Sequence, residues 1–200
     1  MEVTRLDVPE WPNRFVCATT MPLAPNPSAH TEAAGLAALH ALALAGCTAT
    51  QLPPRAGHRP AWPIGFVGSI AHDNALAVAL VARRDVVRTL GVDVERHDAL
   101  AVDDARVVLC DDELDFVGDD AALATLLWSA KESAYKAWCT ALDVDLERVD
   151  PRDIRVAVLG RRELEIGAVG ELQERVAPIG ALQGRSVRVG DLAITAAWKL

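Results

Sequence analysis

The same order of segments occurs twice along this chain: a strand pattern, a long helix pattern, then further strand patterns. In the first occurrence, strand-like residues at 15–20 precede an alanine- and leucine-rich helix at 31–45. That helix stops at Gly46, a residue suited to the position after a helix end. Strand patterns at 66–71 and 75–82 follow the helix. This order of strands and helix predicts an α+β lobe.

The second occurrence of this order begins with an apolar strand at 86–95. Two short helices are expected at 103–109 and 111–117, and a long helix capped by Asp119 or Asp120 runs to about residue 142. The remaining strand patterns lie at 154–159, 163–169, 185–189 and 192–198. Because glycines and prolines separate these short runs, we expect them to form antiparallel strands.

These patterns predict an α+β fold of two lobes with similar build, residues 1–85 and 86–200. About half of the 200 residues are apolar, 51%, which is enough to form a sizeable core. A two-lobed chain has no evident need of a second copy, so we expect a monomer.

The charge of the chain argues against two classes of partner. A net charge of −8 does not suit a protein that neutralises nucleic-acid phosphates or binds an anionic membrane surface. The first residues do not form a signal peptide pattern, and the most apolar run, 33–46, is too short to span a bilayer. The four cysteines are widely spaced, as in a protein of the reducing cytoplasm.

Asp93 and Glu95 lie in the strand pattern 91–95, with valines on either side of Asp93. Side chains alternate along a strand, so the two acids point to the same face while Val92 and Val94 point to the core. Two neighbouring carboxylates on a buried strand repel each other unless a cation lies between them. Magnesium is suited to this role. The alternative is a pair of acids on a strand that faces water.

Glu132 and Lys136 lie one turn apart on the long helix, so they share a face. A surface salt bridge is the simplest interpretation of such a pair. The flanking residues at 128–138 are mostly apolar, however, and charges in such surroundings often serve a function. Lys131 and Lys136 are also two of only three lysines in a chain rich in arginine. Three acids and a lysine brought together would form a site for a hard divalent cation and a phosphate ester.

His72 ends the short strand pattern at 66–71 and begins a loop. A single histidine is most often a neutral surface or core residue. A loop histidine at the entrance of a site can instead donate a hydrogen bond to a phosphate oxygen. Both interpretations stay open from the residue alone.

Taken together, segments 68–72, 91–95 and 128–137 resemble the 4′-phosphopantetheinyl transferases of the surfactin and enterobactin synthetase type. The preceding segment 59–65 is similar to the enterobactin-type subgroup. The resemblance covers roughly residues 51 to 140. It implies two pseudo-symmetric α+β lobes, each a small antiparallel sheet on a long helix, with coenzyme A between them.

The resemblance also implies an activity. A transferase of this family moves the phosphopantetheine arm of coenzyme A to a serine of an acyl or peptidyl carrier protein and releases 3′,5′-ADP. By position, Asp93, Glu95 and Glu132 would hold Mg²⁺, and Glu132 would be the base for the serine. Lys136 would neutralise charge on the bridging or leaving oxygen, with Lys131 assisting nearby. His72 would contact a coenzyme A phosphate.

The chain differs from the family in one respect. Family members usually have basic residues before and within the first long helix, whereas no lysine or arginine occurs here between Arg14 and Arg55. Arg55 and Arg59 are then the candidate phosphate contacts. Two other hypotheses stay open: an enzyme of the same fold whose carboxylates act on a different biosynthetic substrate, and a binding protein without catalytic activity.

Overall fold

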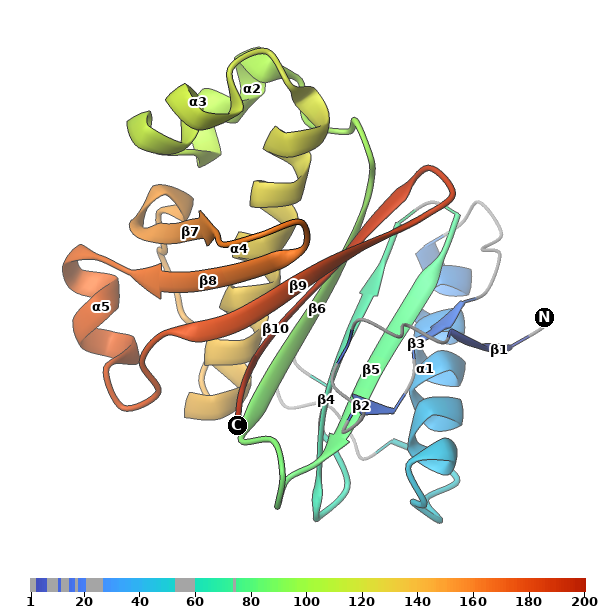
Figure 1. Cartoon of the computed structure of the whole chain (residues 1–200). Coiled ribbons are helices and arrows are strands. Elements are labelled where there is room, and N and C mark those ends of the chain that lie inside the picture. Colours follow the sequence, from blue (N-terminus) through green and yellow to red (C-terminus); the bar gives the residue numbers. More distant parts are fainter. Residues whose placement is uncertain are drawn as a thin grey trace.

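The structure, a computed structural model, describes residues 3–6, 11, 15–16, 18–20, 27–52, 60–73 and 75–200. They form two α+β lobes that lie side by side (Figure 1). In each lobe an antiparallel sheet packs on one long helix, α1 in the first and α4 in the second. The predicted fold class is therefore confirmed.

The N-terminal lobe is built on strand β5, whose two faces have different partners. Ala79 and Val81 pack against α1, whereas Val78 and Leu80 face the second lobe. The sheet has the order β2-β5-β4, and β3 pairs with β1 in a separate two-stranded sheet. The elements are β1 (Thr4–Leu6), β2 (Phe15–Val16), β3 (Ala18–Thr20), α1 (Pro27–Leu44), β4 (Phe66–His72) and β5 (Ala77–Arg83).

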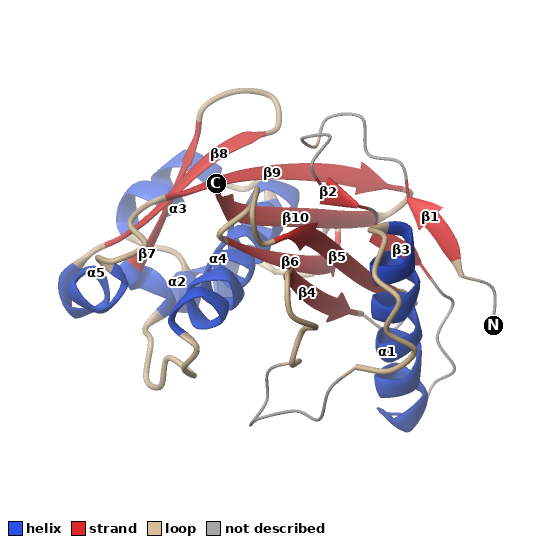
Figure 2. Ribbon diagram, turned by 90° about the horizontal axis from the view of Figure 1, so that it is seen from below, coloured by secondary structure: helices blue, strands red, loops and turns tan. Residues whose placement is uncertain are grey.

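The C-terminal lobe contains a five-stranded antiparallel sheet of order β6-β10-β9-β8-β7, packed against α4 (Figure 2). Its first elements are β6 (Thr89–Arg96), α2 (Val102–Val108), α3 (Asp111–Val117) and α4 (Ala121–Leu142). The 3₁₀-helix η1 (Pro151–Asp153), β7 (Ile154–Val158), β8 (Glu163–Ala168), α5 (Gly170–Val176), β9 (Leu182–Val189) and β10 (Leu192–Lys199) complete the chain.

Strand β6 connects the two lobes because each of its faces packs on a different partner. Leu90, Val92 and Val94 are buried in a core shared with β4, β5 and β10. The opposite face lies against α4, where a Cβ on Gly91 would stand only 1.9 Å from the Ser133 carbonyl oxygen. The absence of a side chain at Gly91 therefore lets α4 approach the strand closely enough for side chains to interact across the interface.

Helix α4 begins where the sequence places its cap. The Asp120 side chain accepts a hydrogen bond from the Leu123 N–H at 3.0 Å, which satisfies one of the free donors of the first turn. The helix ends at Leu142, and Asp143 then adopts a left-handed conformation. Among the described residues, no helix is both long and apolar enough to cross a membrane.

Several elements differ from the sequence prediction. The strand expected at 15–20 is two strands, β2 and β3, which belong to different sheets. Helix α1 begins at Pro27, four residues earlier than expected, and α5 was not predicted. The lobe boundary between residues 85 and 86 stays a prediction.

Candidate functional site

Asp93 lies on the face of β6 that is turned toward α4, and it is only 6% exposed. Its Oδ1 atom accepts a hydrogen bond from the Lys136 Nζ at 2.6 Å. Its Oδ2 atom is buried and has no hydrogen-bond partner among the described residues. The Lys136 ammonium group thus binds one oxygen of this carboxylate, and the other oxygen can still accept a hydrogen bond or bind a metal ion.

Lys136 reaches across from α4 to β6 and does not form the surface salt bridge considered above. Its ammonium group also donates to the Val92 carbonyl at 3.2 Å, so two acceptors on one strand fix its position. The ion pair is partly buried, with 29% of the Lys136 side chain exposed. Electrostatic attraction in such surroundings is stronger than at a surface.

Glu95 and Glu132 add two more carboxylates beside Asp93. Burial, and after it the neighbouring Asp93 charge, raises the pKa of Glu95, while Lys136 and Trp128 act in the opposite direction; together these effects bring that pKa to about 7. Burial also raises the pKa of Glu132, and the charge of Lys136 opposes that shift. Burial therefore makes both carboxylates harder to ionise than ordinary glutamates, and a nearby cation would favour their charged forms.

The balance of charge in this cluster fits a hard divalent cation. Three carboxylates face one ammonium group, and one buried carboxylate oxygen is unused. Within the part of the chain that the structure describes, no three metal-binding side chains are already gathered around one point. The ammonium of Lys136 balances Asp93 instead. Oxygen donors with unbalanced charge are nevertheless the chemistry that Mg²⁺ prefers.

His72 ends β4 beside this cluster. Its ring lies 5.4 Å from that of His30 on α1, measured between centroids. Burial lowers the pKa of His72, and the nearby charges of His30 and Lys136 lower it further. A neutral histidine next to a lysine is suited to donate a hydrogen bond to an anion. The other candidate phosphate contacts, Arg55 and Arg59, lie outside the described residues.

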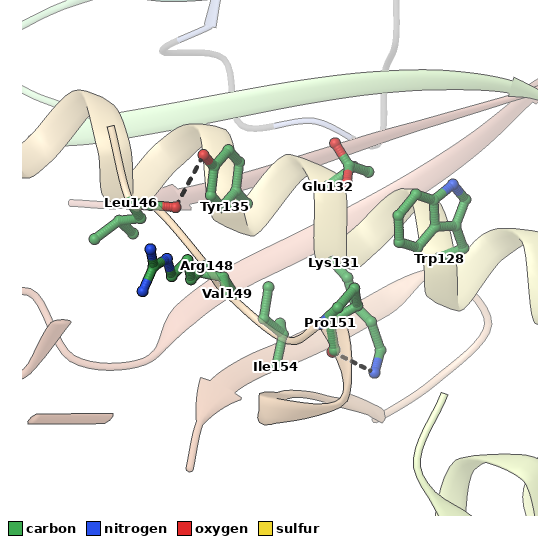
Figure 3. Close-up of a pocket in the computed structure, with 9 residues that line it drawn as sticks. All are labelled: Trp128, Lys131, Glu132, Tyr135, Leu146, Arg148, Val149, Pro151 and Ile154. Atoms are coloured by element: carbon green, nitrogen blue, oxygen red, sulfur yellow. Dashed lines mark hydrogen bonds between the residues drawn. The ribbon is translucent and has the colours of Figure 1, made fainter. Parts of the chain in front are cut away.

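The structure corrects the expectation for Lys131. Its side chain is 1% exposed and points away from Glu132, toward the loop at Pro151 (Figure 3). Lys131 Nζ forms an ion pair with Glu113 Oε2 at 2.6 Å and donates to the Pro151 carbonyl at 3.0 Å. Glu113 also accepts hydrogen bonds from the backbone N–H groups of Cys110 and Val156. Adjacent helix residues point in different directions, so Lys131 connects α4, α3 and β7 and does not belong to the carboxylate cluster.

Two cavities adjoin α4. One, of about 690 Å³, lies between the lobes and is lined by Ser69 and Ile70 of β4 and by Lys136 and Thr140 of α4. The other, of about 260 Å³, lies beside Glu132, between Trp128, Tyr135 and the loop at 146–151 (Figure 3). The Tyr135 hydroxyl donates to the Leu146 carbonyl at 3.2 Å and fixes that loop to the helix.

Comparisons with known proteins place these features in a family. The model of the 4′-phosphopantetheinyl transferase N-terminal domain matches residues 32–82, and the model of the 4′-phosphopantetheinyl transferase superfamily matches residues 89–194. The second match alone covers more than half of the chain. The chain belongs to the 4′-phosphopantetheinyl transferase superfamily.

Curated relatives agree with this assignment to the phosphopantetheinyl transferases. The chain is 44% identical over 84 residues to 4′-phosphopantetheinyl transferase PptT of Mycobacterium tuberculosis, across 40% of this chain and 37% of that protein. It is 36% identical over 107 residues to 4′-phosphopantetheinyl transferase Svp of Streptomyces mobaraensis, across 50% and 43%. It is 36% identical over 115 residues to enterobactin synthase component D of Salmonella typhi, across 52% and 44%. The chain thus spans less than half the length of these relatives.

Two solved structures of ACPS from Chronobacterium ammoniagenes, one apo and one with CoA, also match. Each is 21% identical to the present chain, and each alignment covers 55% of the present chain. The alignments cover 93% and 94% of the two ACPS chains, with TM-scores of 0.46 and 0.44. A likeness this distant does not bear on the assignment.

Sequence reasoning missed two neighbours of the carboxylate cluster. Trp128, at the start of the 128–137 motif, interacts with Glu95 across the α4–β6 interface and lowers the pKa of that carboxyl group. The helical spacing shows that Trp128 and Glu132 share a face, so this role was accessible from the sequence. His30 contacts His72 only because α1 packs on β5, and nothing local to the sequence indicates that contact.

The ion pair of Lys131 gives a stability prediction for this family member. Lys131→Met removes the ammonium group and leaves the Glu113 carboxylate buried without a cation. We expect the free energy of unfolding, measured by urea denaturation, to fall by about 3 kcal/mol. Lys199→Met is the control, because Lys199 donates to a carbonyl in an exposed setting. An equal loss from both variants would contradict the assigned role of Lys131.

Glu95 gives a pH prediction for the metal-free protein. Its pKa is about 7 when folded and near the usual 4.5 when unfolded, so the folded state binds the proton more tightly. This group's contribution to stability is complete below pH 4.5 and is lost as the pH rises through 7. At pH 8 the free energy of unfolding of Glu95→Gln should therefore be about 1 kcal/mol higher than that of the wild type, after allowing for solvent screening.

The same comparison in urea at pH 5 should show little difference between Glu95→Gln and the wild type, with a chelator present at both pH values. Glu165→Gln on β8, an exposed strand acid, is the matched control. A gain in stability that is the same at pH 5 and pH 8 would argue against a raised pKa at Glu95.

Proposed function

We propose that this chain transfers the 4′-phosphopantetheine arm of coenzyme A to a serine of an acyl or peptidyl carrier protein, with Mg²⁺ bound and with release of 3′,5′-ADP. The observation that carries the proposal is the meeting of Asp93, Glu95, Glu132 and Lys136 at the α4–β6 interface. This interface borders a cavity between the lobes that is large enough for part of a nucleotide-bearing cosubstrate.

The reaction forms one bond to phosphorus and breaks another. The carrier serine oxygen attacks the phosphorus that bears the pantetheine arm, and the bond from this phosphorus to the bridging diphosphate oxygen breaks. The electron pair leaves with 3′,5′-ADP. Such a displacement needs positioning and charge neutralisation more than covalent catalysis.

Glu132 is the proposed base. Burial raises its pKa above the usual value for a glutamate, which brings it nearer to the pH at which a base accepts a proton efficiently. The serine proton moves to a Glu132 oxygen as the new bond forms. Lys136, fixed by Asp93 and the Val92 carbonyl, neutralises charge on the oxygen of the leaving group.

The proposed ligands of Mg²⁺ are Asp93, Glu95 and Glu132. When bound, the ion would withdraw charge from the diphosphate oxygens. His72, beside Lys136 and with a lowered pKa, is the proposed donor to a phosphate of coenzyme A. Arg55 and Arg59 remain proposed phosphate contacts, and the protein is proposed to be a cytoplasmic monomer.

A transfer assay tests the proposal directly. The protein is incubated with coenzyme A, Mg²⁺ and an apo carrier protein, and the carrier is then weighed by mass spectrometry. We expect a gain of one phosphopantetheine group. A carrier whose acceptor serine is replaced by alanine is the control. No gain with any of several acyl and peptidyl carriers would overturn the transfer function.

One observation favours a second candidate, an enzyme of this fold that acts on a different substrate. Helix α1, next to the cavity wall, contains no lysine or arginine between Pro27 and Leu44. A missing charge-assisted contact to a phosphate weakens binding of coenzyme A. Measurable Mg²⁺ binding, together with absent binding of coenzyme A in calorimetry, would support this candidate over the first.

A further inference from the structure

Three buried oxygen atoms between α4 and the paired strands β6 and β10 have no hydrogen-bond partner within the described residues. They are Asp93 Oδ2, Ser129 Oγ and Thr195 Oγ1. Ser129 and Thr195 are both 0% exposed. Because a buried hydroxyl without a partner lowers stability, native proteins rarely contain several at one interface. Their presence together indicates a shared polar interaction.

The strand register places Thr195 next to Asp93. The two residues are direct partners in the antiparallel pair of β10 and β6, so their side chains lie on the same face of the sheet. That face is covered by α4, since the Ser133 hydroxyl donates to the Thr195 carbonyl at 2.8 Å. Ser129 lies one helical turn before Ser133, on the same face of α4.

Contacts along the interface place Ser129 at the level of Asp93. At one end of β6, the Thr89 hydroxyl donates to the Ala137 carbonyl at 2.6 Å. At the other end, Glu95 is reached by Trp128. The helix therefore runs antiparallel to the strand, and Asp93 lies opposite the helical turn that begins at Ser129.

We propose that Thr195 and Ser129 position the Asp93 carboxylate through one buried water that both hydroxyls bind. The water accepts hydrogen bonds from the two hydroxyls and donates one to Asp93 Oδ2. Three hydrogen bonds are typical of a buried water. The two oxygens of Asp93 are then held from opposite sides, Oδ1 by Lys136 and Oδ2 by this water.

This role matters for the proposed cation, and in that respect the inference rests on the proposed function. A carboxylate oxygen that accepts one hydrogen bond still has a lone pair for a metal. Hydrogen bonds to ligating carboxylates fix their orientation, and their loss typically weakens metal binding 10- to 100-fold. Thr195 and Ser129 are thus positioning residues that act through Asp93.

Thr195→Val tests the inference, because valine has nearly the same shape as threonine without the hydroxyl. We expect the Kd for Mg²⁺, measured by calorimetry without coenzyme A, to rise about 10-fold or more. Thr195→Ser should restore it to near the wild-type value. Thr125→Val is the matched control: Thr125 is buried and hydrogen-bonded to Ala121 and Leu100, away from the cluster. It should lose stability and keep its Mg²⁺ affinity.

The melting temperature of the metal-free protein supplies a second readout with a definite sign. If the Thr195 hydroxyl had no partner, valine would remove an unsatisfied polar group and the melting temperature would rise. The inference requires a fall, of about 3 °C for one lost hydrogen bond. An unchanged Mg²⁺ affinity, or a melting temperature that stays equal or rises in Thr195→Val, would overturn it.

These outcomes are separate from those of the transfer assay. A wild-type chain that modifies no carrier, while Thr195→Val still weakens Mg²⁺ binding and lowers the melting temperature, overturns the transfer function and leaves this inference standing. If the wild type modifies a carrier but Thr195→Val changes neither the Mg²⁺ affinity nor the melting temperature, the transfer function stands and this inference is overturned.

Discussion

Asp93→Asn and Glu132→Gln are each expected to lower phosphopantetheine transfer by about 10³-fold while the chain stays folded. Asp93→Asn removes the anion that fixes Lys136 and that we propose as a ligand of Mg²⁺. Glu132→Gln removes the proposed base for the carrier serine. Both substitutions preserve side-chain shape, so the loss reflects charge and proton transfer. The measurement is the initial rate of carrier modification at saturating coenzyme A.

Glu165→Gln is the matched control for these two variants. Glu165 is an exposed acid on β8, far along the sheet from β6, and its loss should leave the rate unchanged. Near-ultraviolet circular dichroism verifies that all three variants keep native packing. Full transfer by a folded Asp93→Asn or Glu132→Gln variant would refute the proposed roles of these carboxylates.

Gly91→Ala is expected to lower the free energy of unfolding by about 4 kcal/mol, the largest stability loss predicted for this chain. The new Cβ would lie 1.9 Å from the Ser133 carbonyl oxygen and 2.8 Å from the Ala137 nitrogen. Both atoms belong to the backbone of α4, so no side chain can rotate away. The helix itself must move off the strand, and Lys136 then moves away from Asp93. Urea denaturation measures the loss.

Gly167→Ala is the control for the strand glycine. Gly167 lies in β8, and a Cβ there would meet no atom within 4 Å. This variant should be as stable as the wild type or slightly more stable, since alanine reduces the freedom of the unfolded chain. If both alanine variants lost the same stability, close packing of α4 on β6 would not be the cause.

Patterns within single segments predicted most of the fold. In β6, Val92 and Val94 pack in the core shared with β4, β5 and β10, whereas Asp93 faces α4, as the sequence indicates, because side chains alternate between the two faces of any strand. Asp120 caps α4 as expected, because capping depends on neighbouring residues. Helix α5 was missed although Leu172 and Val176 are both buried and one turn apart, because a helix this short carries only one such pair.

The different partners of the two lysines in the 128–137 motif could not be predicted in this way. Lys131 and Lys136 occur in one helix, and their spacing alone does not show what each faces. Packing decides: α3 and β7 bring Glu113 and the Pro151 carbonyl to Lys131, while β6 brings Asp93 to Lys136. The partners come from segments distant in sequence, so only the assembled lobe identifies them.

By itself, the sequence determined most of the helices and strands, their order, and the acids and lysines that a phosphoryl-transfer site needs, because strand alternation, helix periodicity and capping depend on neighbouring residues. The tertiary structure decided which charges meet. It paired Lys136 with Asp93, buried Lys131 against Glu113, and set Thr195 beside Asp93 through the register of β10 on β6. Those contacts depend on how sheets and helices pack, and packing joins residues that no local pattern connects.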